Sequence, residues 1–221
     1  MSNEEKKRNF ALGLDIGMKV DNSALCVVEI IDNKCVVKVL IKYPLGTPWD
    51  TLYDTVVEVA KDVALQGTVL SFNIDATGVG AIPADVLRQR LPEIQVNAFK
   101  FTSQTKRELI GKVKVLHTLG KLKFARRGGD PIYNQVIQDL ITEMRYIQAK
   151  IMRGDDNTSL EVEIFKTGTH DDLFTALALA IKDIDINIDW NNIGSLVDFV
   201  EDKTWTKTPL DEPNFEPIIF F

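Results

Sequence analysis

The amino-acid sequence predicts an α/β domain, and three observations support that prediction. Apolar or alternating runs at residues 10–15, 23–31 and 35–41 predict three strands, and the polar turn at residues 32–34 joins the last two as a hairpin. The chain then alternates segments of helical periodicity with short apolar strands. Two of the predicted strands end in aspartate. We therefore expect an antiparallel amino-terminal meander followed by mixed helices and strands.

Length and composition favour one globular domain with a tail. The chain has 221 residues, of which 45% are hydrophobic and 26% charged, enough for a sizeable core. No apolar run approaches the roughly 20 residues of a membrane span, and the charged segment before Phe10 lacks a signal-peptide core. We expect an intracellular protein with no membrane contact. Cys26 and Cys35 lack metal-site spacing and are predicted to be buried free thiols.

The middle of the chain reads as alternating helices and strands. Residues 49–66 have helical spacing and stop before Gly67, and residues 69–75 form a short apolar strand. A helix follows at residues 82–91, with a proline in its first turn, and residues 96–101 alternate like a strand. These segments supply the second strand that ends in aspartate.

The remaining segments predict three helices and a hairpin. Ser103 or Thr105 caps a helix with a basic face, and residues 131–149 form an amphipathic helix. The segment Ile151–Phe165 predicts a projecting β-hairpin, and the alanine- and leucine-rich helix that ends at Ile181 should be deeply packed. We divide the chain into a linker remnant at residues 1–9, a domain at 10–186 and an acidic tail at 187–221.

The net charge of −6 hides a basic band in the middle of the chain. Between residues 100 and 127 the only acid is Glu108, whereas nine of the eleven charged residues at 183–216 are acids. A local basic field governs contact with polyanions, although a helix face of this kind is also commonly just solvated. The predicted DNA-binding residues are Lys100, Lys106, Arg107, Lys112 and Lys114.

Aspartates occur at three positions, which we call acidic stations, and each lies at the end of a predicted strand or at the start of a predicted helix. Asp15 and Asp75 each end a strand, and Asp171 and Asp172 open the buried helix. Converging carboxylates suit Mg²⁺ or Mn²⁺, since zinc favours His and Cys. Two such ions about 4 Å apart can activate water and stabilise a leaving oxygen in phosphodiester hydrolysis. The alternative is that these aspartates only cap helices and form turns.

Two further residues are candidates for accessory roles. Asp21 follows the turn after Gly17 and either faces the same site or forms a turn with Asn22. His170 precedes the helix acids and is a candidate ligand, proton shuttle or cap neighbour. His117 is interpreted as an ordinary residue of the basic helix.

The order of three motifs resembles one protein family. Leu12-Gly13-Leu14-Asp15-Ile16-Gly17, Asn73-Ile74-Asp75-Ala76-Thr77-Gly78-Val79-Gly80 and Gly168-Thr169-His170-Asp171-Asp172 together resemble the nuclease domain of tailed-phage large terminase subunits. The resemblance runs from about Phe10 to Ile184. It implies an RNase H-like fold with a central mixed β-sheet flanked by helices.

The resemblance also implies a function. It implies a Mg²⁺- or Mn²⁺-dependent endonuclease with two ions that cuts concatemeric double-stranded viral DNA during packaging in the host cytoplasm, with little sequence preference. Asp15 and Asp75 match the first two catalytic acids, the His-Asp-Asp motif matches the third, and Asp21 matches an accessory acid. The implied partners are an ATPase domain of the same subunit, the portal and the small terminase. The hairpin resembles an element that distinguishes terminase nucleases.

Three other readings remain open at this stage. A junction resolvase or transposase shares the carboxylate arrangement, and Leu14-Asp15-Ile16-Gly17 also resembles the first phosphate loop of sugar kinases and actin-like ATPases. A catalytically silent DNA-binding module is the third. No Gly-x-x-x-x-Gly-Lys-Ser/Thr motif occurs in the chain, so it is not a P-loop motor. We expect an isolated, monomeric nuclease domain.

Overall fold

The computed structural model describes residues 8–17, 21–78, 81–125, 130–153, 160–166 and 171–187. Six strands form one sheet in the order β5-β4-β1-β2-β3-β6, with β1 near its centre. Their bounds are β1 Asn9–Asp15, β2 Ser23–Ile31, β3 Lys34–Tyr43, β4 Thr68–Asp75, β5 Val96–Phe99 and β6 Leu122–Phe124. The predicted linker remnant, except for residues 8 and 9, and the tail beyond residue 187 lie outside the described residues.

The sheet is mixed, as predicted. β1, β2 and β3 pair antiparallel and form the expected meander, whereas β4 runs parallel to β1 and to β5, and β6 runs parallel to β3. Asp32 and Asn33 take positive φ angles of 47° and 60° in the turn between β2 and β3. Such angles suit Asp and Asn in a tight hairpin, so this turn fixes the register of the meander.

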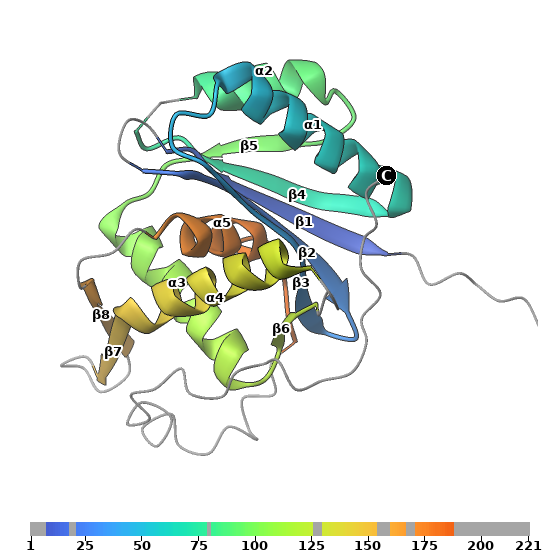
Figure 1. Cartoon of the computed structure of the whole chain (residues 1–221). Coiled ribbons are helices and arrows are strands. Elements are labelled where there is room, and N and C mark those ends of the chain that lie inside the picture. The colour runs from blue at the N-terminus through green and yellow to red at the C-terminus, as the bar shows by residue number, and fades with distance from the viewer. Residues whose placement is uncertain are drawn as a thin grey trace, which may run out of the picture.

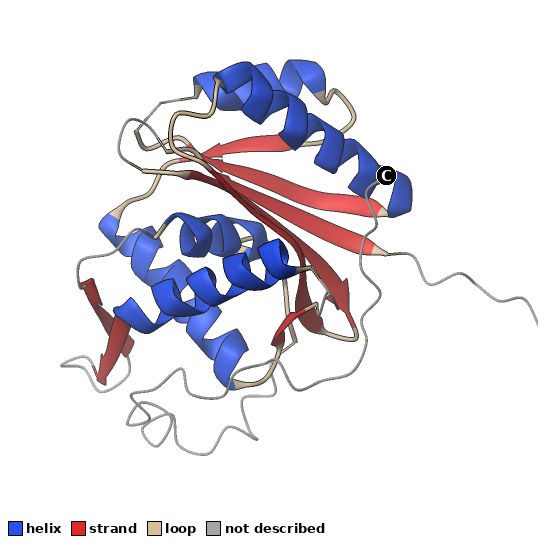
Figure 2. Cartoon of the chain, in the orientation of Figure 1, coloured by secondary structure: helices blue, strands red, loops and turns tan. Residues whose placement is uncertain are grey.

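Helices cover both faces of the sheet (Figures 1 and 2). α1 (Trp49–Gln66) and α2 (Ile82–Arg90) lie on one face. α3 (Ser103–Thr118), α4 (Pro131–Tyr146) and α5 (Asp172–Ile181) lie on the other. Within the described ranges no helix is both long and apolar enough to cross a membrane.

The alternation of side chains along β1 divides the core into two layers. Phe10, Leu12 and Leu14 pack into the cluster beneath α1 and α2, while Ala11 packs into the cluster with α3, α4 and α5. The small residues lie on the side of α5. A Cβ atom on Gly13 would lie 2.1 Å from the carbonyl oxygen of Ala176, so only glycine allows this approach. α5 is therefore packed directly onto the central strand.

All ten residues of α5 are buried, as its apolar composition predicts. Such a helix has no solvent-facing side, since the sheet, α3 and α4 surround it. Cys26 and Cys35 are also buried, and both are free thiols, as expected.

Two elements differ from the expectation. The helix predicted at residues 131–149 ends at Tyr146, and β7 (Ile147–Arg153) begins there and pairs antiparallel with β8 (Leu160–Lys166). The hairpin is confirmed, but it starts four residues earlier than Ile151. Ile147 is buried in the same core as α4, so the apolar spacing continues across the junction. β6 was not predicted, because three residues show too little periodicity.

Candidate active site

Parallel pairing brings the first two aspartates to the same end of the sheet. Leu14 of β1 lies beside Ile74 of β4, and each strand ends one residue later, at Asp15 and Asp75. Because parallel strands end in the same direction, the two carboxylates leave the sheet side by side. The pattern of an apolar strand ending in Asp therefore marks two adjacent positions in space.

α5 brings the third acidic station, Asp171 and Asp172, to this end of β1. Asp171 is its N-cap residue and Asp172 its first residue. The Asp172 side chain is buried, with 3% of its surface exposed, and its Oδ2 accepts a hydrogen bond from the Asn22 amide at 3.2 Å. Asp171 is more exposed. Of the two aspartates, Asp172 is therefore held more firmly in the interior.

Asp15 lies at the centre of the negative charge. Burial raises the pKa of its carboxyl well above the usual value, and the charges of Asp75, Asp172 and Asp171 raise it further. The charge of Lys106 acts in the opposite direction. The other two acidic stations thus act electrostatically on the half-buried carboxylate of Asp15, as is common at functional sites.

Lys106 faces the acids from the first turns of α3. Its Nζ lies 3.0 Å from Oδ2 of Asp171, on the neighbouring helix. The N-cap is Thr102, not Ser103 or Thr105 as predicted, and the capping box that Thr102 forms with Thr105 fixes the start of α3 and thus the direction of this lysine. Lys106 therefore lies at the border between the acidic site and the predicted basic surface.

The loop after β4 orients Asp75. Its Oδ1 accepts a hydrogen bond from the Thr77 amide at 2.7 Å, and the Thr77 hydroxyl accepts one from the Phe101 amide at 2.9 Å. These two bonds tie the end of β4 to the segment that leads into α3. The carboxylate of Asp75 is thus oriented by backbone geometry rather than by a charged neighbour.

The donor set fits a hard divalent cation. Carboxylate oxygens are the ligands that Mg²⁺ and Mn²⁺ favour, and the charges that act on Asp15 are those of three carboxylates and one lysine. In the part of the chain that the structure describes, no three Asp, Glu, His or Cys side chains already form an arrangement that could hold a metal ion.

The accessory candidates fall in different places. Asp21 is exposed, next to Asn22, whose amide contacts Asp172. A Cβ atom on Gly17 would lie 2.1 Å from the Asp21 carbonyl oxygen, so the chain folds back tightly here. His170 lies outside the described residues. The roles of both stay predictions.

The five predicted DNA-binding residues divide into groups. Lys100 and Arg107 are exposed, and Lys114 is partly exposed. Lys106 faces the acids, as described above. Lys112 turns toward the protein and donates to the carbonyl oxygens of Lys182 at 2.8 Å and Ile184 at 2.6 Å. The expected solvent-facing stripe therefore holds for only part of the set, and Lys112 has a structural contact that the sequence did not reveal.

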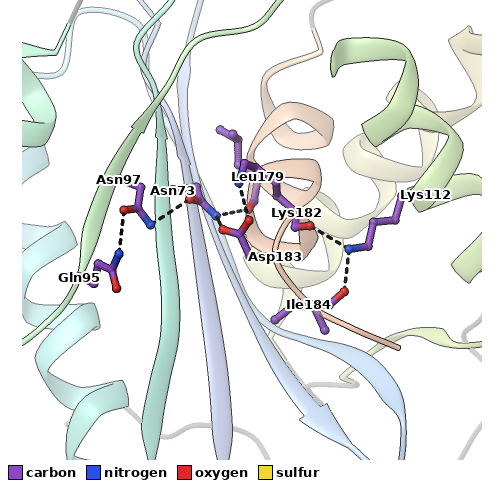
Figure 3. A network of polar contacts seen from close by, with 8 residues as sticks. All are labelled: Asn73, Gln95, Asn97, Lys112, Leu179, Lys182, Asp183 and Ile184. Atoms are coloured by element: carbon purple, nitrogen blue, oxygen red, sulfur yellow. Dashed lines mark hydrogen bonds and ion pairs between the residues drawn. The ribbon is translucent and has the colours of Figure 1, made fainter. Parts of the chain in front are cut away.

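A polar network around the buried Asn73 side chain holds the last turn of α5 (Figure 3). Asn73, fully buried in β4, donates to the Leu179 carbonyl oxygen at 3.0 Å and to Asp183 Oδ2 at 2.9 Å. Asn97 of β5 reaches the Asn73 side chain at 3.4 Å. Together with Lys112, these contacts satisfy carbonyl groups that the end of a helix leaves without partners.

Sequence reasoning also missed Glu143 of α4. Its carboxylate is buried, and burial raises its pKa to about 8, while the hydrogen bond from the Phe174 amide and the charge of Lys42 act in the opposite direction. A signal was present, because Glu143 lies three residues after Leu140 on the apolar stripe of α4. A single acidic residue among the core-facing positions of a helix indicates that its side chain is buried and has a hydrogen-bond partner there.

Comparison with known proteins identifies the family. The sequence matches the family described as terminase RNaseH-like domain over residues 12–183. A comparison with curated proteins found no match.

Several solved structures share the fold. The large terminase nuclease from thermophilic phage G20c has a TM-score of 0.56 and 19% identity, covering 80% of this chain and 83% of that one. The same nuclease with bound magnesium gives a TM-score of 0.53 at 20% identity, covering 82% and 84%. The human cytomegalovirus terminase nuclease domain gives 0.57 at 12%, covering 83% and 87%. With an RNase H-like fold and a family match over most of its length, this chain belongs to the terminase RNaseH-like domain family.

Proposed function

We propose that this domain is a metal-dependent endonuclease that cleaves double-stranded viral DNA during genome packaging. The observation that carries the proposal is the meeting of carboxylates from β1, β4 and α5 at Asp15. Family membership supports it, as do relatives of the same fold that were solved with magnesium or soaked in manganese. The rival readings, a resolvase or a phosphotransferase, have no comparable support.

Asp15, Asp75 and Asp172 are the proposed ligands of two Mg²⁺ or Mn²⁺ ions, with Asp171 as a further ligand. When bound, such ions supply an activated water and stabilise the departing 3′ oxygen. Asp15 has to be ionised to serve as a ligand, and its raised pKa means that metal and proton compete for it. Asp21 and His170 are proposed as accessory groups.

Lys106 is proposed to work at the edge of the site. Its ion pair with Asp171 orients that carboxylate and leaves a positive charge near the place where a scissile phosphate would bind. A lysine at this place offsets part of the repulsion between DNA and the acids. Lys106 thus belongs to the active site as well as to the basic surface.

The DNA path is proposed to follow α3. Lys100, Arg107 and Lys114 supply charge that contacts phosphates, which position the duplex without reading its sequence. The hairpin lies beside this surface, since β8 contacts α3 and β7 contacts α4. Little sequence preference is therefore expected.

The wider setting is also a proposal. An ATPase domain of the same subunit, the portal and the small terminase are the expected partners, and cleavage would take place in the host cytoplasm. These proposals rest on the family alone.

Nicking of supercoiled plasmid in Mg²⁺ or Mn²⁺ tests the nuclease proposal. Asp15→Asn, Asp75→Asn and Asp172→Asn should each lower the rate by about 100-fold or more, because each removes a carboxylate that would hold a metal ion. Asp50→Asn is the matched control, since Asp50 is an exposed residue of α1 on the opposite face. No cleavage by the wild-type protein, or full activity of the Asp15 or Asp75 variant, would contradict the proposal.

A further inference from the structure

The first turn of α5 is capped from another helix. Amides in the first turn of a helix lack partners within the helix, and the N-cap side chain usually supplies an acceptor. Asp171 is the N-cap residue here, yet its side chain makes no capping bond and contacts Lys106 instead. Oε2 of Glu143, on α4, accepts the hydrogen bond of the Phe174 amide at 2.9 Å. Glu143 therefore caps the first turn of α5 in place of Asp171.

α5 needs directional contacts because its surface is nearly uniform. It is buried all round and consists mostly of alanine and leucine, and apart from the close approach of Gly13 to Ala176 and Ala180 its apolar side chains make no directional contact. Contacts with polar geometry then fix its position. At its last turn they come from Asn73 and Lys112, and at its first turn from Glu143. Of these three residues, only Glu143 acts at the end that carries Asp171 and Asp172.

We propose that Glu143 is a positioning residue, whose hydrogen bond to the Phe174 amide sets where Asp171 and Asp172 stand relative to Asp15. Its effect on cleavage rests on the nuclease function proposed above, whereas its effect on the first turn of α5 does not. It acts on the site through the backbone of α5.

The local charges indicate that the hydrogen bond, not the negative charge, is the useful part of Glu143. The carboxylate is 6% exposed and shares its surroundings with the charges of Asp171 and Asp172, opposed by Lys42. A further negative charge here adds to the repulsion within the acidic cluster. A neutral acceptor of the same shape should therefore replace it, and glutamine provides one.

Three substitutions separate the acceptor from the charge. Glu143→Gln keeps an acceptor of the same length and should behave like the wild type. Glu143→Met keeps the volume but removes the acceptor. Glu143→Asp keeps the carboxyl group but withdraws the acceptor by one methylene, and it provides a second test if the Met variant folds poorly.

Hydrogen–deuterium exchange without metal tests the cap itself. In Glu143→Met and Glu143→Asp the amides at the start of α5 should exchange roughly tenfold faster, because a lost cap weakens the first turn. Exchange in α1 should not change. Unchanged protection at the start of α5 in both variants would overturn the proposal, whether or not the protein is a nuclease.

Metal binding and kinetics then separate positioning from a merely structural role. The Met and Asp variants should need about 10- to 100-fold more Mn²⁺ for half of the metal-induced rise in Tm, as expected for residues that orient ligands. Their kcat for nicking should fall with an unchanged KM for DNA, and Glu143→Gln should restore both readouts. Faster exchange with unchanged Mn²⁺ dependence would overturn the positioning role. A wild-type protein that binds Mn²⁺ but does not cut would instead count against the nuclease function alone.

Discussion

The two ends of α5 are held by different chemistry. At its last turn, Asn73 and Lys112 donate hydrogen bonds to carbonyl groups, so donors meet acceptors. At its first turn, Asp171 and Asp172 gather near Asp15, and the nearby cation is Lys106. The last turn is built to hold the helix, whereas the first turn carries an excess of negative charge that a metal ion can relieve. Substitutions at the two ends should therefore differ in their effects on stability and activity.

The largest effect on stability is expected from Asn73→Asp. The new carboxylate has no N–H groups to replace the two hydrogen bonds that Asn73 donates. It would face the Leu179 carbonyl oxygen and lie beside the Asp183 carboxylate. An uncompensated buried charge costs about 3–5 kcal/mol, measured as the loss of free energy of unfolding in urea at pH 7. Asn97→Asp is the matched control, because its contact to Asn73 is long, at 3.4 Å, and its side chain is partly exposed. Equal losses in the two variants would show that Asn73 is not the key residue of the network.

Lys112→Met should lower the free energy of unfolding by about 2 kcal/mol, because it leaves two carbonyl groups short of a donor. Binding to a short labelled duplex should keep its salt dependence. Arg107→Met is the matched variant: its stability should change little, while the slope of log K against log salt should become shallower by about 1. Fluorescence anisotropy at several salt concentrations checks both. A shallower slope of log K against log salt for Lys112→Met would show that Lys112 contacts DNA after all.

Glu143, which caps the first turn of α5, should make the stability of the protein depend on pH. The pKa of Glu143 is about 8 in the folded protein against 4.5 for the unconstrained group, so the folded state keeps a proton that the unfolded state has lost between these values. Stability should therefore fall as pH rises from about 4.5 to 8, by at most about 1.4 kcal/mol per pH unit from this group. Urea unfolding in EDTA should show a flatter profile for Glu143→Gln. Glu108→Gln, on the exposed face of α3, should keep the wild-type slope. Identical slopes for Glu143→Gln and the wild type would contradict the burial of the Glu143 side chain.

The smallest expected effect is a gain in stability. In EDTA at pH 7, Asp15→Asn should raise Tm by about 2–4 °C, because it removes a carboxylate that burial and its acidic neighbours disfavour. Saturating Mn²⁺ should narrow or reverse this difference in Tm, since the wild type would bind the ion through the Asp15 carboxylate, which the variant lacks. Differential scanning fluorimetry with and without metal measures both values. A lower Tm for the variant in EDTA would show that Asp15 is stabilised by contacts other than a metal.

Local patterns were enough for most of the fold. The meander, the helices and the hairpin follow from periodicity and turn residues, and the two strands ending in Asp15 and Asp75 were recognised from apolar runs. β6 was missed because it is three residues long, and the end of α4 was misplaced because Ile147 continues the apolar stripe into a strand. Both errors occur where tertiary packing, not local preference, decides the conformation.

The partners of individual side chains were harder to predict. Lys106 and Lys112 belong to one helix and to the same basic run, yet one faces Asp171 and the other the end of α5. The sequence contains no signal for this difference, because it depends on how α5 packs against α3. The two acids that open α5 also differ, because the Asp172 side chain is buried and that of Asp171 is more exposed. The ligand roles of these residues stay predictions.

Gly13 sets the thickness of the layer between the sheet and α5. A methyl group at this position would meet the backbone of Ala176 and Ala180, at 2.1 and 2.4 Å, and neither backbone atom can turn aside. The helix would have to rise from the strand and would carry Asp171 and Asp172 away from Asp15 with it. The spacing of the acidic cluster is thus controlled from the middle of the core, by a residue that has no side chain to take part in the chemistry.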